Sequence, residues 1–221
     1  MRVLQSFSTS VGSKILIGLT GLTLVGFLIF HLAGNLLVFF GPESYNEHAQ
    51  ALISNPLIIP AEIGLAALFL LHVYKTIVNF ASNRAARPER YRMKKWAGGA
   101  SRKSVGSTTM IASGLVTFVF VGLHLKTFKY GAHYQVVNQP AVRDLYRLLI
   151  EVFHRPGYVA FYVASMIVIG LHLRHGISSA FQSIGLMPAG WTRGLLIGGL
   201  TLALLIAGGF LIIPIAVYLF L

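Results

Sequence analysis

Four histidines lie well inside long apolar stretches of this 221-residue sequence. They occur in the segments FHLAGN, LHVYK, GLHLK and GLHLRHG, as His31, His72, His124 and His172. Histidine is rare inside membrane-spanning helices, and an ionisable side chain there is a candidate for a functional role. Imidazole nitrogen is also a common ligand of metal ions and of haem iron. The chemistry therefore depends on whether the elements that carry these histidines bring them together.

The composition indicates a membrane protein rather than a soluble domain. Hydrophobic residues make up 55% of the chain and charged residues 11%, with a mean hydropathy of +0.72, whereas soluble domains carry about 25% charged residues. The absence of cysteine excludes a disulfide framework, an iron–sulfur cluster and a thiolate metal site within this chain. The net charge of +12 is concentrated between apolar segments, which favours membrane orientation over nucleic-acid binding.

Five apolar segments are long enough to cross a bilayer, which takes about 20 helical residues. The sequence therefore predicts an all-α integral membrane bundle of five transmembrane helices, forming one domain over residues 1–221. The N-terminus lacks the pattern of a removable signal peptide, so none is expected. The predicted spans are 14–40, 57–83, 105–128, 157–182 and 191–218.

Loop charges predict the orientation. The loop 84–104 carries eight Lys and Arg residues, whereas the loop after the first span carries none. By the positive-inside rule, the N-terminus and this basic loop are expected to be cytoplasmic. In the outer loop 129–156, the stretch Ala141–Phe153 places its apolar residues on one face, which predicts a helix along the membrane surface.

Depth along the spans groups the four histidines into two pairs. His31 and His124 lie 17 and 19 residues from the inner starts of their spans, or about 25–28 Å from the inner face. His72 and His172 lie 11 and 10 residues from the inner ends of theirs, or at about 15–16 Å. Two imidazoles at one height on different helices can bind a haem iron from both sides. We therefore expect two b haems, an outer one on His31 and His124 and an inner one on His72 and His172.

Other interpretations of these histidines are weaker. A single intramembrane histidine can simply hydrogen-bond to a neighbouring helix, but four of them in two depth-matched pairs favour haem ligation. Two ligands per level would leave zinc or copper under-coordinated. The fifth span has no histidine and is expected to pack at the edge of the bundle.

Haem propionates need cationic or hydrogen-bonding partners. Lys75 and His175 each follow an inner ligand by three residues, on nearly the same helix face, and Arg174 adjoins the second of them. These three are candidates for the inner propionates, with snorkelling to the headgroups as the alternative. Lys126 and Lys129 are candidates for the outer haem or for anchoring the helix end.

Glu62 is the only carboxylate inside a predicted span. It is a candidate for proton exchange with a quinone beside the outer haem, although a negative charge also suits a helix N-terminus. His48, His133 and His154 fall in outer loops, where surface roles are expected.

Over nearly its whole length the chain resembles the di-haem cytochrome b subunit of succinate:quinone oxidoreductases, the single-subunit five-helix type. The stretches that carry the resemblance are LTGLTLVGFLIFHLAGNLLVFFGPESYN, LHVYKTI, FVGLHLKTFKYG and GLHLRHGISSAFQSIG, of which HLAGN and HLRHG with the following SAFQ are the most specific. In that family four helix histidines ligate two b haems, and they match His31, His72, His124 and His172. The haem pairing in the family agrees with the pairing by depth.

The resemblance implies a membrane anchor for a flavoprotein subunit containing FAD and an iron–sulfur subunit, both on the cytoplasmic face. Electrons from succinate would pass through the inner and outer haems to a quinone in a bacterial cytoplasmic membrane, often menaquinone in this family, as part of the respiratory chain and the tricarboxylic acid cycle. Some fumarate reductases of the family have a glutamate two residues before the fourth-helix ligand. This chain has Gly170 there, which favours succinate oxidation or another coupling route.

Two other functions remain open from the sequence. The chain could be the cytochrome b anchor of another quinone-linked enzyme, such as a formate dehydrogenase, a hydrogenase or a fumarate reductase. It could also be a transporter with buried histidines in a proton relay, although no second half repeats the first. A b-type absorbance spectrum would separate electron carriers from a transporter.

Overall fold

The computed structural model describes residues 9–86, 105–137 and 139–221, and five of its helices are long and apolar enough to span a membrane. Two of the five continue into a short turn, a 3-10 turn at Leu37–Phe40 and a π turn at Leu125–Lys129. The expected all-α membrane bundle is confirmed, and the chain is a multi-pass membrane protein. Most of the predicted basic loop, residues 87–104, lies outside the described residues. The five helices are α2 (Ser10–Leu36), α4 (Ile58–Ala85), α5 (Val105–His124), α7 (Pro156–Ser183) and α8 (Thr192–Phe220).

Local sequence explains where several of these helices begin. The Thr9 side chain accepts a hydrogen bond from the Gly12 N–H at 3.0 Å and caps α2. Pro156 occupies the first turn of α7, where its missing N–H costs no helical hydrogen bond. A short 3-10 turn at Ala189–Trp191 precedes α8. The α8 helix continues through Pro214, which is buried.

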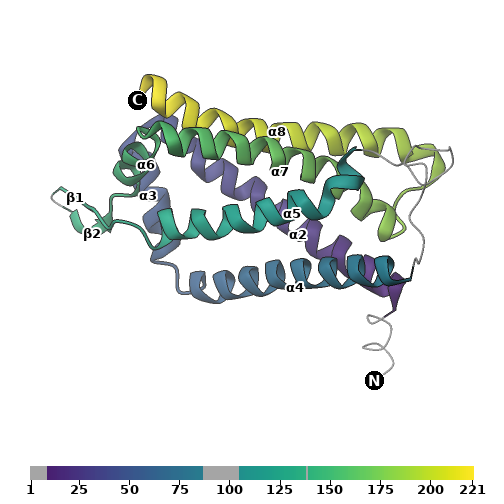
Figure 1. The fold of residues 1–221 in the computed structure, drawn as a ribbon. Coiled ribbons are helices and arrows are strands. Elements are labelled where there is room, and N and C mark those ends of the chain that lie inside the picture. The colour runs from purple at the N-terminus through teal and green to yellow at the C-terminus, as the bar shows by residue number, and fades with distance from the viewer. Residues whose placement is uncertain (1–8, 87–104, 138) are drawn as a thin grey trace.

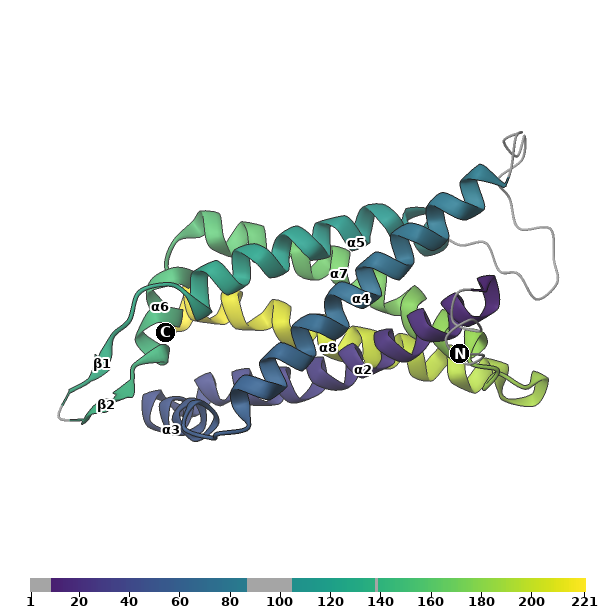
Figure 2. The same cartoon turned by 90° about the horizontal axis from the view of Figure 1, so that it is seen from below.

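Four of the long helices form a ring, and the fifth covers one side of it (Figures 1 and 2). In this ring α2 packs against α4 and α7, α5 packs against α7, and α4 makes a smaller contact with α5. The fifth helix, α8, packs mainly on α7 and also on α2. The helix without a histidine therefore lies outside the ring but is well packed on α7, whereas α4 contains no buried residue.

Large apolar side chains cover much of the outer surface. Phe30, Leu115 and Leu204 are each more than half exposed, and α4 contains no buried residue. A soluble helix would place polar residues on such a face, whereas lipid favours apolar ones. The best-packed core lies instead between α7 and α8, where Ile177 and Ile206 are almost fully buried.

Short elements cap the end of the bundle where α2 and α8 end (Figure 1). They are the helices α3 (Pro42–Ile53) and α6 (Leu145–Phe153) and the antiparallel strands β1 (Gln135–Val136) and β2 (Gln139–Arg143). The α3 helix was not expected from the sequence. Pro42 starts it, directly after Gly41 with a φ of 96°, a left-handed conformation that glycine adopts without strain.

The predicted surface helix Ala141–Phe153 is shorter than expected and faces the protein. It begins only at Leu145, because the Asp144 side chain accepts a hydrogen bond from the Arg147 N–H at 3.0 Å and caps the helix. Residues before the cap belong to β2. The apolar face of α6 packs against α7, α8 and α3, so Leu149 is only 2% exposed. The apolar face of this helix was predicted correctly, but it packs against the helix bundle and does not lie on the membrane surface.

Candidate functional site

His31 and His124 meet across the centre of the ring. They belong to α2 and α5, which are not among the principal packed pairs of helices. Their ring centroids are nevertheless 5.8 Å apart, with the ring planes at 89°. An iron bound to two imidazole nitrogens at about 2 Å each would hold the centroids about 6 Å apart. The observed separation is therefore compatible with a shared metal centre between the two rings.

His72 and His172 occupy the other diagonal of the ring, on α4 and α7. These helices, too, are not principal packing partners. The two imidazoles lie close enough for their charges to interact. Each diagonal of the ring therefore carries one of the histidine pairs that depth along the spans had suggested.

A buried hydroxyl binds Nδ1 of His72. The Thr20 Oγ1 atom of α2 lies 3.0 Å from this nitrogen. Because Oγ1 already donates to the Leu16 carbonyl at 2.8 Å, it accepts from the imidazole N–H. This tautomer leaves Nε2 of His72 without a proton and available as a ligand.

The same arrangement recurs at His172. The Ser113 Oγ atom of α5 lies 3.0 Å from Nδ1 of His172 and donates to the Met110 carbonyl at 3.1 Å. Both hydroxyl-bearing residues are buried, Thr20 at 6% and Ser113 at 7% exposure. Metal-binding histidines commonly donate their second N–H in this way, which fixes the ring orientation.

Two glycines allow these imidazoles to approach the neighbouring helix. A Cβ atom on Gly21 would lie 3.2 Å from Cε1 of His72, and one on Gly114 would lie 3.4 Å from Cε1 of His172. Each glycine directly follows the hydroxyl residue that binds the same ring. Neither Thr20 nor Ser113 was among the residues predicted from the sequence. A polar residue followed by glycine, facing the bundle inside an apolar span, is the signal that could have found them.

Aromatic side chains surround the other pair. The His31 ring stacks on Phe27 at 5.2 Å and lies 5.6 Å from Phe210 of α8. The His124 ring stacks on Phe120 at 5.7 Å, and its Nδ1 lies 3.3 Å from the Tyr162 hydroxyl. The outer histidines therefore lie in a largely apolar shell with one hydroxyl partner, Tyr162, which was not predicted from the sequence either.

The HLAGN motif ties His31 to the capping helix α3. Asn35 donates from Nδ2 to the His31 carbonyl at 2.8 Å and accepts from the Tyr45 hydroxyl at 3.2 Å. The His48 ring lies against Gly34, where an added Cβ would approach Nε2 to 2.7 Å. His48 is exposed, as expected for a surface residue, and its ring also lies against α2 one turn beyond His31. His133 and His154 are exposed.

The propionate candidates lie near the inner pair to different degrees. Lys75 is half-buried on α4, one turn after His72, and has an interaction partner. His175 is half-buried and close enough to His172 for charge interaction. Arg174 is exposed, consistent with its position two residues along the helix from His172.

Glu62 lies at the surface of α4 and forms an ion pair with Lys129. The two side chains are 43% and 44% exposed, so the pair contributes little to stability. It links the first turns of α4 to the π turn that follows His124. The lysine that pairs with Glu62 lies in the turn directly after His124, and the Glu62 carboxylate is engaged with this lysine.

Gly170 is a position where α7 and α8 approach closely. A Cβ atom added there would lie 2.9 Å from the Ala207 Cβ, which is an inflexible neighbour. A glutamate at this position would therefore require α8 to move.

The donor set fits haem better than a bare metal ion. In the described ranges no three or more His, Asp or Glu side chains come together, whereas a zinc site takes three or four protein ligands. A porphyrin supplies four nitrogens itself, so two axial imidazoles complete the coordination of its iron. Comparisons with protein-family models, with curated proteins and with solved structures find no match for this chain.

Proposed function

We propose that the chain is the di-haem cytochrome b membrane anchor of a succinate:quinone oxidoreductase. The observation that carries this proposal is the placement of two histidine pairs on the two diagonals of a four-helix ring. His31 and His124 would hold an outer haem, and His72 and His172 an inner one. Haem, when bound, supplies one-electron transfer at its iron.

The neighbouring residues would prepare these imidazoles for ligation. The hydroxyls of Thr20 and Ser113 hold the inner rings with Nε2 unprotonated. The Tyr162 hydroxyl lies beside Nδ1 of His124, as the Thr20 and Ser113 hydroxyls lie beside Nδ1 of the inner histidines. Because the helices of each diagonal are not packed on each other, a flat cofactor between them would not displace a tight helix contact.

The proposed partners follow from the family resemblance. A flavoprotein subunit with FAD and an iron–sulfur subunit would dock on the cytoplasmic face of a bacterial inner membrane, the side of the N-terminus. Electrons would pass from succinate through the two haems to a membrane quinone, with menaquinone as the expected one. Lys75, Arg174 and His175 are proposed partners of the inner propionates, and Glu62 of the quinone or its protons.

Absorbance spectroscopy tests the cofactor. Purified protein reduced with dithionite should show a b-type spectrum with two haems per chain. His31→Ala and His124→Ala should each remove the outer haem and keep the inner one, while His72→Ala and His172→Ala should do the reverse. His133→Ala, in the exposed outer loop, is the matched control and should retain both.

Two results would contradict the proposal. Colourless protein, purified with its lipids and partner subunits, would exclude haem ligation. Loss of one shared signal in His31→Ala and His72→Ala would refute the pairing. If both haems are present, the co-purifying subunits and succinate-dependent quinone reduction separate this enzyme from other quinone-linked dehydrogenases.

A further inference from the structure

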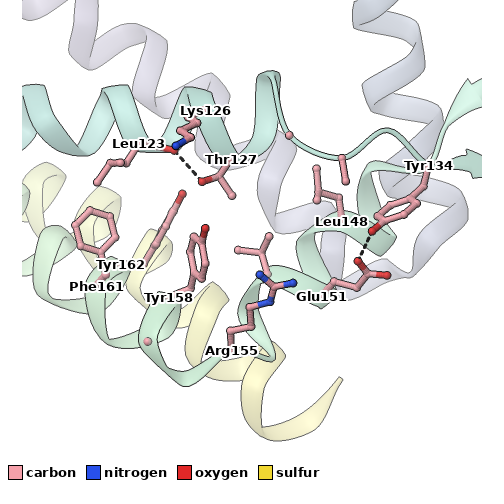
Figure 3. A pocket seen from close by; sticks show the side chains of 14 residues that line it. Leu123, Lys126, Thr127, Tyr134, Leu148, Glu151, Arg155, Tyr158, Phe161 and Tyr162 are labelled. Carbon is pink, nitrogen blue, oxygen red and sulfur yellow. Dashed lines mark hydrogen bonds between the residues drawn. The ribbon is translucent and has the colours of Figure 1, made fainter.

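A cavity of about 580 Å³ opens at the capped end of the bundle, between α5, α6 and α7 (Figure 3). It is separate from the histidine pairs, although Tyr162 belongs to both its wall and the surroundings of His124. Cavities of about 300–1,000 Å³ are typical of small-molecule sites. The cavity is therefore large enough for a ligand.

Two cations line this cavity from opposite sides. Arg155 reaches in beside Tyr158 from the start of α7, and Lys126 faces it from the π turn that follows α5 (Figure 3). Within the described ranges, neither side chain forms an ion pair or a hydrogen bond. The cavity therefore presents two positive charges that a ligand could neutralise.

The carboxylate in the wall does not cancel these charges. Glu151 accepts a hydrogen bond from the Tyr134 hydroxyl at 2.6 Å and pairs with Arg147 Nε at 3.0 Å. The Tyr134 hydroxyl and the Arg147 guanidinium hold the pKa of Glu151 below its usual value, so the carboxylate stays ionised. The charge of Arg155 also acts on Glu151, but three cations, Lys126, Arg147 and Arg155, lie around this single carboxylate, so the cavity as a whole favours an anion.

The rest of the wall is mostly apolar and lies at the end of the membrane spans. Leu123, Phe161 and Tyr162 line the deeper part, and Leu148 and Val152 of α6 close one side. Arg155 directly precedes the span that starts at Pro156, and Lys126 lies within the last turn of the span that ends at Lys129. A span of 28 residues is about 42 Å long, so its ends reach the headgroup region.

We propose that this cavity binds the phosphate headgroup of an anionic phospholipid, with Lys126 and Arg155 on the phosphate and the acyl chains along Leu123 and Phe161. Arginine suits phosphate because its planar guanidinium can donate two parallel hydrogen bonds. Basic pockets between membrane helices bind anionic headgroups in the same way. A quinone, which is neutral, would leave both cations without a counter-charge.

Native mass spectrometry of the full chain in mild detergent tests the site. Phosphatidylglycerol is the anionic probe, and phosphatidylcholine, with no net charge, is the comparison lipid. Lys126→Gln and Arg155→Gln should each weaken phosphatidylglycerol binding about fivefold or more. Lys129→Gln removes the same charge one turn further along, outside the cavity, and should change binding by less than about twofold.

The charge-conserving variants Lys126→Arg and Arg155→Lys should keep most of the phosphatidylglycerol binding, which guards against misfolding as the cause of a loss. Equal binding of the two lipids, or an equal loss in Lys129→Gln, would overturn the proposal. Displacement of phosphatidylglycerol by a short-chain menaquinone would overturn it in favour of a quinone site. None of these results depends on whether the histidines bind haem.

Discussion

Removing the Thr20 hydroxyl tests the inner haem site without touching a ligand. Thr20→Val keeps the branched side chain but deletes the oxygen that lies 3.0 Å from Nδ1 of His72. Thr20 is only 6% exposed, so water cannot easily replace the lost partner. We therefore expect a specific defect in the haem held by His72.

The size of the defect follows from the hydrogen bond. The His72 ring also interacts with the Ile17 backbone, so Thr20→Val removes one of its two partners, and the loss of an outer-shell partner of a metal-binding histidine changes metal affinity by about 10- to 100-fold. Thr20→Val should therefore weaken binding of the inner haem by about one to two orders of magnitude. Ser113→Ala should weaken the same haem, because its hydroxyl has the same role at His172.

The assay is a haem titration of the apo-protein, followed by redox titration of the bound haems. Thr23→Val is the matched control, since the Thr23 hydroxyl donates only to the Leu19 carbonyl at 3.0 Å and is exposed. It should leave both haems unchanged. An equal loss in Thr23→Val, or a loss confined to the outer haem in Thr20→Val, would refute the assigned role of this hydroxyl.

Two further predictions concern packing and pH. Gly170→Ala should destabilise the chain by about 1–3 kcal/mol through overpacking against α8. Gly176→Ala is the control and should not destabilise it, because no atom lies within 4 Å of the added Cβ. Thermal unfolding in detergent measures both variants, and equal stabilities would refute the close contact at Gly170. The depressed pKa of Glu151 means that its ionised form stabilises the fold above the usual carboxyl pKa, and that this contribution is lost as the pH falls through the lower folded value. The difference in unfolding temperature between wild type and Glu151→Gln should therefore be larger at pH 7 than at pH 3, and an unchanged difference would count against the interactions with Tyr134 and Arg147.

The fold class could be predicted because it depends on local sequence. Crossing a bilayer needs about 20 apolar residues that satisfy their own backbone hydrogen bonds, and these runs are visible in the sequence. The heights of the four histidines follow from the same periodicity, since each helical residue advances by a fixed rise. The shared height of His31 and His124 was therefore foreseeable from the sequence, whereas their proximity depends on how the helices pack.

Which helices pack against each other depends on side-chain contacts that the local sequence does not encode. The pattern in Ala141–Phe153 indicated an apolar face, but only the folded chain places that face against the bundle, and only the Asp144 cap sets its start. The roles of Thr20 and Ser113 likewise arise from imidazoles 52 and 59 residues away in the sequence. The sequence by itself determined the spans and the depth of each histidine. The tertiary structure decided which helices form the diagonals, because side-chain contacts between distant segments fix how the helices pack, and local hydropathy does not.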